Sequence, residues 1–207
     1  MEVSSFLDIL WQNILNTTWL EIIAVAFGMV SVWLAKKENI LVYPTGIISV
    51  LIYVYICFFA KLYADMGINF FYFLMSLYGW YMWTRKGVTS PILKISGSRW
   101  YGNVLNIFAV IVMFFVLRYL LINYTDSDVP AWDSLTTAIF IVAMWLMARK
   151  KIEHWIAWMV GNTISIPLYF YKELVFTSFQ YIVFLVLAIL GYIEWQKKLQ
   201  DKMMNRQ

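Results

Sequence analysis

The chain has 207 residues, of which 62% are hydrophobic, 19% aromatic and only 14% charged. This composition excludes an ordinary soluble domain and predicts an all-α integral membrane protein. The formal net charge of +4 is explained by the loop charges expected of a membrane protein, and it does not indicate a nucleic-acid partner.

Seven segments are apolar and long enough to cross a hydrocarbon core of about 30 Å, which requires roughly 20 residues each. In chain order they cover residues 19–35, 40–59, 66–84, 103–122, 131–148, 155–171 and 174–195. Residues 1–18 are apolar on one side only, so we expect an interfacial helix there, with an eighth span as the alternative. No positive charge precedes the first span, so a cleavable signal peptide is not expected.

Charged residues between the predicted spans indicate how the chain crosses the membrane. Thirteen of the 16 Lys and Arg residues fall on one side, and only Lys61, Arg118 and Lys172 fall on the other. Because basic loops remain in the cytoplasm, we expect the N-terminus outside and the C-terminus inside a bacterial cytoplasmic membrane. The single Cys57 predicts no internal disulfide and is interpreted as lipid-facing or packing material.

The sequence contains an internal repeat, because residues 33–83 resemble residues 145–195. The matches pair Trp33 with Trp145, Ser49 with Ser165, Tyr53 with Tyr169, Gly79 with Gly191 and Trp83 with Trp195. The predicted layout is a 3+1+3 arrangement of transmembrane helices. Its expected parts are a first three-helix repeat at 19–86, a loop and linker span at 87–130, a second repeat at 131–196 and a basic cytoplasmic tail at 197–207.

An odd linker helix gives both repeats the same membrane orientation. Transporters built from parallel repeats carry substrate between the two halves, near the midplane of the bilayer. The alternative is that the duplication only produced a larger bundle, as in a membrane scaffold that transports nothing.

One predicted span carries a polar and aromatic stripe. Trp155, Trp158, Asn162, Ser165 and Tyr169 recur at a spacing that places them on one face of a helix. In the first repeat, the positions 116 residues earlier are Asn39, Val42, Gly46, Ser49 and Tyr53. Because the second repeat is bulky where the first is small, we expect a hollow beside two indole rings.

This stripe suits a flat, positively charged solute. Indole faces attract cations by about 0.5–2 kcal/mol per ring and stack on heterocycles, while Asn162 offers both a donor and an acceptor. Asn69 and Gln180, in the third span of each repeat, are placed to reach the same hollow. Hydrogen bonding between helices is the alternative role for all three amides. Tyr53 and Tyr169 are expected as walls, with core packing as their alternative.

Other tryptophans are better explained as anchors at the membrane surface. This interpretation is applied to Trp19, Trp83, Trp100, Trp132 and Trp195, which lie near the predicted span ends. Trp155 is also close to a span end, so anchoring remains an alternative for it.

The W-x-x-W-x-x-x-N pattern at Trp155, Trp158 and Asn162, together with "LYADMG" and "YGWYMW", resembles the Pnu-type vitamin transporters over residues 19–195. This resemblance implies uptake of an unphosphorylated vitamin by facilitated diffusion, with trapping by a cytoplasmic vitamin kinase, and a fold related to the SWEET sugar transporters. Leu190 stands where the nicotinamide riboside branch often has a polar residue, which favours thiamine as substrate, with nicotinamide riboside as the alternative.

Absent motifs favour energy-independent transport. The sequence has no phosphate-binding loop and no carboxylate near the centre of a predicted span. An enzyme is not expected, nor a cofactor or metal, because the single His154 is placed at the cytoplasmic surface, far from Cys57. Lys172 precedes the last span, which argues against a retinal photoreceptor. Self-association into a homo-oligomer is compatible with a bundle of this size.

Overall fold

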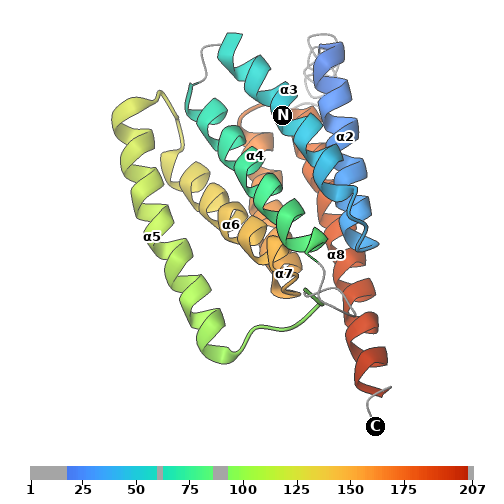
Figure 1. Ribbon diagram of the computed structural model, residues 1–207. Coiled ribbons are helices and arrows are strands. Elements are labelled where there is room, and N and C mark those ends of the chain that lie inside the picture. Colours follow the sequence, from blue (N-terminus) through green and yellow to red (C-terminus); the bar gives the residue numbers. More distant parts are fainter. Residues whose placement is uncertain (1–17, 60–62, 86–92, 205–207) are drawn as a thin grey trace.

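The computed structural model describes residues 18–59, 63–85 and 93–204, and these form an all-helical fold (Figure 1). Its helices are α2 (Trp19–Lys36), α3 (Val42–Phe59), α4 (Tyr63–Thr84), α5 (Trp100–Tyr124), α6 (Pro130–Ala148), α7 (Glu153–Tyr171) and α8 (Val175–Met204). The interfacial helix predicted at the N-terminus lies outside the described residues. The seven predicted spans each correspond to one of these helices.

Local sequence signals explain where two of the helices begin. Thr18 caps α2, because its hydroxyl accepts the amide of Glu21 at 3.3 Å and the Glu21 carboxylate accepts the amide of Thr18 at 2.7 Å. This reciprocal capping satisfies two backbone donors that a helix start leaves free. Helix α6 begins with Pro130, whose fixed φ angle and missing N–H suit the first helical position.

Five of the described helices, α2, α3, α5, α6 and α8, are long and apolar enough to cross a membrane by length and composition. Helices α4 and α7 have spanning length but are less apolar, because they carry many Tyr, Trp and amide side chains. Such residues are expected where helices face a polar cavity instead of lipid. The lower hydropathy of α4 and α7 therefore agrees with their place beside the cavity described below.

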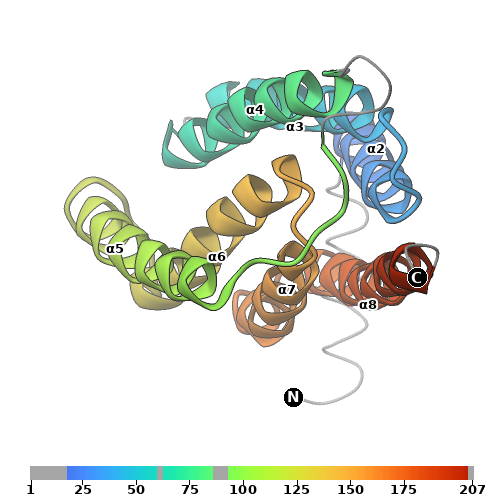
Figure 2. The ribbon, with the colours of Figure 1, turned by 60° about the horizontal axis from the view of Figure 1, so that its bottom comes forward.

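Six helices surround the centre of the molecule, and the seventh lies outside them (Figure 2). Within the first repeat α3 packs between α2 and α4, and within the second repeat α7 packs between α6 and α8. The repeats meet along two seams, where α2 packs on α8 and α4 packs on α6. Helix α5 packs mainly against α6 and has no buried residue, as expected of a linker span facing lipid. The predicted 3+1+3 arrangement is confirmed.

At one end of the bundle, paired hydrogen bonds join the repeats. The indole Nε1 of Trp83 donates to the carbonyl of Met147 at 3.2 Å, and the indole Nε1 of Trp195 donates to the carbonyl of Ala35 at 3.1 Å. The two donors are 112 positions apart in sequence, and so are the two acceptors. Each repeat therefore donates one indole hydrogen bond to the other repeat and accepts the equivalent bond from it, as expected of a pseudo-twofold axis.

The same end carries an ion pair formed by equivalent residues of the two repeats. Glu38 has a φ of 60° and Lys150 a φ of 51°, so both connections between the first and second helices turn through the left-handed region. The Nζ of Lys150 lies 2.7 Å from a carboxylate oxygen of Glu38. Lys37 over Trp33 and Arg149 over Trp145 repeat one cation–π contact at 3.7 and 4.2 Å.

These contacts correct the register expected for the stripe. Tyr43 lies against Gly79 as Trp155 lies against Gly191, so Trp155 corresponds to Tyr43, 112 positions earlier, and not to Asn39. Asn39 precedes α3, and its side chain is exposed and accepts the amide of Leu41 at 2.9 Å. The placement of Asn39 on a helical stripe was wrong, because α3 begins at Val42 and Asn39 lies in the connection before it.

Two tryptophans expected as surface anchors lie in the core. Trp195 is fully buried and Trp83 is 8% exposed. Trp195 makes edge-to-face contacts with His154 and with Trp155, which is 1% exposed and for which anchoring was the alternative role. His154 is completely buried as well, so its expected position at the surface was wrong. The other expected anchors, Trp19, Trp100 and Trp132, are exposed as predicted.

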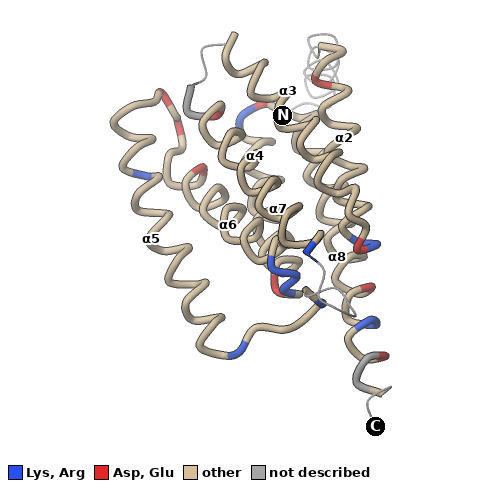
Figure 3. The backbone as a smooth tube through the Cα atoms, in the orientation of Figure 1, with Lys and Arg blue, Asp and Glu red and all other residues tan. Residues whose placement is uncertain are grey.

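Basic residues are distributed unevenly along the bundle axis. Lys and Arg gather at the end where α8 leaves the bundle, here called the basic end (Figure 3). The opposite end, here called the acidic end, carries Glu21 in the first turn of α2, Asp65 in that of α4 and Asp133 in that of α6. The segment predicted as a separate basic tail continues α8 as a helix through Met204.

Candidate functional site

A cavity of about 750 Å³ lies between the two repeats. All six helices around the centre contribute to its wall, and α5 contributes none of the lining residues. Its volume falls within the range of about 300–1,000 Å³ that is usual for small-molecule sites. The cavity reaches from Glu21 and Asp65 at the acidic end to Tyr43, Met147 and Trp155, next to the hydrogen bonds that join the repeats at the basic end.

One wall of this cavity is a continuous set of stacked rings from the second repeat. Phe140 lies 5.0 Å from Trp158 at an interplanar angle of 27°, and 6.1 Å from Tyr181 at 5°. Tyr181 lies 5.0 Å from Tyr169 at 21°. Three helices thus supply four rings that hold one another in place, and a flat heterocycle can extend this stacking.

The opposite wall is small where this aromatic wall is large. At the positions equivalent to Phe140 and Trp158, 112 residues earlier, the first repeat has Gly28 and Gly46, and both glycines line the cavity. A Cβ added to Gly46 would lie 3.1 Å from the Ser31 hydroxyl. The predicted asymmetry between the repeats is therefore present, although its residue pairs differ from those expected.

Asn162 is the most deeply placed amide of the cavity. It lines the cavity from α7 while being only 2% exposed. Among the described residues its side chain has no hydrogen-bond partner. Because unpaired polar groups in a buried site cost free energy, such groups are expected to meet a ligand or water.

The other predicted site residues divide into two groups. Tyr53, Tyr169, Asn69 and Gln180 all line the cavity, as expected. The Asn69 amide donates to the carbonyl of Asp65 at 2.9 Å, which is a bond within its own helix and not a link between helices.

Asn39 does not reach the cavity, for the reason given above. Trp155 does, but it forms part of the floor, where its ring packs on Gly191 and its Nε1 has no acceptor among the described residues. Trp158, one turn further along, presents its ring to the cavity beside Phe140.

Several lining residues were missed from the sequence. Phe140 and Tyr181 lie on α6 and α8, and nothing in their own spans distinguishes them from lipid-facing aromatics. With the correct shift of 112 residues, Phe140 corresponds to Gly28 and Tyr181 to Asn69 in the first repeat. This correspondence would have marked both residues as candidates for the cavity lining. Cys57, expected to be lipid-facing or packing material, is buried and lines the cavity.

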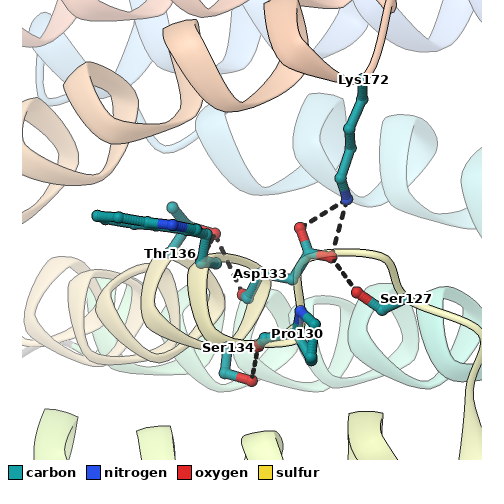
Figure 4. Close-up of polar contacts among 7 residues, drawn as sticks. Ser127, Pro130, Asp133, Ser134, Thr136 and Lys172 are labelled. Carbon is teal, nitrogen blue, oxygen red and sulfur yellow. Dashed lines mark hydrogen bonds and ion pairs between the residues drawn. The ribbon is translucent and has the colours of Figure 1, made fainter.

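An ion pair fastens α6 to α7 at the acidic end (Figure 4). The Nζ of Lys172 donates to both carboxylate oxygens of Asp133, at 2.7 and 2.8 Å, and the hydroxyl of Ser127 donates to one of them at 2.7 Å. The side chains of Lys172 and Asp133 are 25% and 19% exposed. This pair stays within the second repeat.

Comparison with known proteins identifies the family. The model of the nicotinamide mononucleotide transporter family matches residues 18–197. The chain belongs to this family. The resemblance to the Pnu-type vitamin transporters is thereby confirmed, and the chain is a multi-pass transporter of the inner membrane and not an enzyme.

Among curated relatives, the nicotinamide riboside transporter PnuC of Escherichia coli K12 is 28% identical over 215 residues, which cover 90% of this chain and 89% of the relative. The riboflavin/roseoflavin transporter RibM of Streptomyces davaonensis is 25% identical, with 86% and 84% covered. A crystal structure of the vitamin B3 transporter PnuC superposes with a TM-score of 0.73 at 27% identity, covering 95% of this chain and 90% of that one.

Proposed function

We propose that this protein transports nicotinamide riboside through the cavity between its repeats. The observation that carries the proposal is the aromatic wall of Phe140, Trp158, Tyr169 and Tyr181 beside the unpaired amide of Asn162. The nicotinamide ring of this substrate is flat and positively charged, and its carboxamide is both a donor and an acceptor. Stacking on the wall and pairing with Asn162 match these two properties.

The relatives support nicotinamide riboside over thiamine, which the sequence had favoured on the basis of Leu190. Transporters named for nicotinamide riboside include relatives from Escherichia coli and Haemophilus influenzae, the latter 25% identical. None of the relatives named here is described as a thiamine transporter. Leu190 is 42% exposed and does not line the cavity, so its identity has no direct bearing on the substrate.

Transport is proposed to be facilitated diffusion by alternating access. The basic end is taken as cytoplasmic because basic residues gather there, and the acidic end as external. Glu21 and Asp65 then attract a cationic substrate to the cavity from outside. One repeat rocks against the other, and a cytoplasmic kinase that phosphorylates the substrate supplies the direction of net uptake. Assembly into a homo-oligomer remains a prediction.

Uptake into proteoliposomes tests the substrate and the energetics together. Radiolabelled nicotinamide riboside should equilibrate with empty vesicles without accumulating, and an uncoupler should change neither the rate nor the final level. Vesicles loaded with a nicotinamide riboside kinase and ATP should accumulate label as the phosphorylated product. Accumulation in empty vesicles that collapses with an uncoupler contradicts facilitated diffusion.

Binding by the purified protein separates the candidate substrates. Nicotinamide riboside should quench tryptophan fluorescence saturably, and Trp158→Ala should remove most of the quenching because this ring borders the cavity. Trp100→Phe is the matched control, since Trp100 is 77% exposed on α5. Tighter binding of thiamine or riboflavin than of nicotinamide riboside contradicts the proposed substrate.

A further inference from the structure

A second cavity, of about 210 Å³, lies at the basic end of the molecule. Its charged lining residues are Glu38 from the first repeat, Lys94 from the segment before α5, and Lys150 and Lys198 from the second repeat. Three aliphatic side chains, Leu93, Ile95 and Leu199, complete the wall. The volume is below the range usual for a drug-sized ligand and suits a single small charged group.

The charges around this cavity do not balance. The carboxylate of Glu38 accepts from the Nζ of Lys150 at 2.7 Å and lies 3.5 Å from the Nζ of Lys198. Lys94 has neither an ion pair nor a hydrogen bond within the part of the chain that the structure describes. Lys150 and Lys198 therefore share one carboxylate, and Lys198 also donates to the carbonyl of Lys37 at 3.2 Å. With Lys94 included, the charged side chains that line this cavity carry two more positive charges than negative ones.

Only one of the three lysines is withheld from water, since Lys94 is exposed and the Lys198 side chain is 35% exposed. The Lys150 side chain is only 9% exposed, and its Nζ lies 4.4 Å from the centre of the Trp83 ring. A charge in such a place requires compensation, because the loss of hydration is costly. Glu38 compensates one of the two lysines that reach it, and a bound anion would compensate the rest.

We propose that this second cavity binds a phosphate group. A phosphate monoester carries about −1.5 to −2 charges near pH 7, which equals the surplus positive charge, and lysine is a regular phosphate partner. The group can belong to a free phosphate monoester or to the headgroup of an anionic lipid, whose phosphodiester has two non-bridging oxygens and carries a single negative charge. The bound group would contact both repeats and the segment before α5 together.

The proposal does not depend on the identity of the transported substrate. It is tested by isothermal titration of inorganic phosphate and of ribose 5-phosphate into the purified full-length protein, in an uncharged detergent at constant ionic strength. Lys94→Gln and Lys198→Gln should each weaken phosphate binding at least tenfold. Lys197→Gln is the matched control, because this substitution removes the same charge from the same helix as Lys198→Gln. Lys197 is exposed and does not line the cavity.

A second arm distinguishes the two sources of phosphate. The protein is transferred to nanodiscs of phosphatidylglycerol or of phosphatidylcholine, and its melting temperature is measured without added phosphate. If the lipid headgroup is the natural occupant, phosphatidylglycerol raises the melting temperature of the wild type and of Lys197→Gln, but not of Lys94→Gln or Lys198→Gln. If a free monoester is the occupant, the titrations separate the variants and the two lipids do not.

The proposal is overturned if neither arm separates Lys94→Gln and Lys198→Gln from the wild type. It is equally overturned if Lys197→Gln loses as much binding as they do, because that result indicates a diffuse basic surface. Transport of nicotinamide riboside is measured on the same preparations without phosphate. Loss of phosphate binding with intact transport, or the reverse, keeps the two proposals distinguishable.

Discussion

Asn162→Leu separates a substrate-binding role for the amide from a role in joining helices. Asn162 is 2% exposed, lines the cavity and has no side-chain partner within the described residues. Leucine has a similar size and no polar atoms. The substitution therefore removes no described hydrogen bond from the free protein, and it removes two polar groups that are costly to bury.

The expected magnitudes have opposite signs for stability and for binding. The free energy of unfolding should stay unchanged or rise by about 1 kcal/mol, because a buried unpaired amide is replaced by an apolar group. The free energy of nicotinamide riboside binding should weaken by about 1–3 kcal/mol, because the carboxamide of the substrate loses its partner in a dry site. This corresponds to an increase in Kd of about 5- to 150-fold.

Ser178→Ala provides the comparison with a real contact between helices. The Ser178 hydroxyl donates to the carbonyl of Ile166 at 2.8 Å, so that α8 is joined to α7, and Ser178 does not line the cavity. Its loss should lower stability by about 0.5–1.5 kcal/mol and leave the Kd unchanged. Thermal unfolding in detergent and fluorescence titration give both quantities. The reasoning is refuted if Asn162→Leu lowers stability as Ser178→Ala does while the Kd stays the same.

Three further predictions concern the cavity and the contacts that close it. Gly161→Ala should weaken substrate binding and cost about 1–3 kcal/mol of stability, because the added Cβ would overlap the Phe140 ring. Gly67→Ala is the control, since a Cβ there meets nothing within 4 Å, and it should be neutral in the fluorescence titration and in thermal unfolding. Equal effects of the two substitutions contradict this packing. Cys57 is the single cysteine and lines the cavity, so nicotinamide riboside should slow its reaction with a maleimide several-fold, and an unchanged rate would place the substrate elsewhere. Trp195→Phe should lower the melting temperature by removing a bond between the repeats at 3.1 Å, at a cost of about 1–3 kcal/mol; a melting temperature equal to that of the wild type would show that this bond is dispensable.

Sequence reasoning predicted the parts of the fold that depend on one segment at a time. Apolar length located all seven spans, since hydrocarbon thickness sets a minimum that each span must meet. Duplication was visible because Trp33 and Trp145, or Gly79 and Gly191, keep both their identity and their order. The placement of Trp158 and Asn162 beside a cavity followed from helical spacing and from the cost of polar groups in a membrane.

The remaining features depend on contacts between segments. The register failed at Trp155 because matching serines and tyrosines suggested a shift of 116, whereas the packing of Tyr43 on Gly79 requires 112. Trp83 and Trp195 were taken as anchors because span-end position alone does not show that an indole hydrogen-bonds to the opposite repeat. The aromatic wall was only partly predicted, since its rings come from three helices.

Symmetry and asymmetry are divided between two regions of this molecule. At the basic end, residues 112 positions apart make reciprocal contacts, so each repeat holds the other by the same groups. In the cavity the equivalent positions differ, because the first repeat has Gly46 where the second repeat has Trp158. A symmetric contact lets two similar units rock about a common axis, whereas a nucleoside has no such symmetry and requires unlike walls. Divergence after duplication would therefore be concentrated in the lining of the cavity, where identical walls could not match an asymmetric solute.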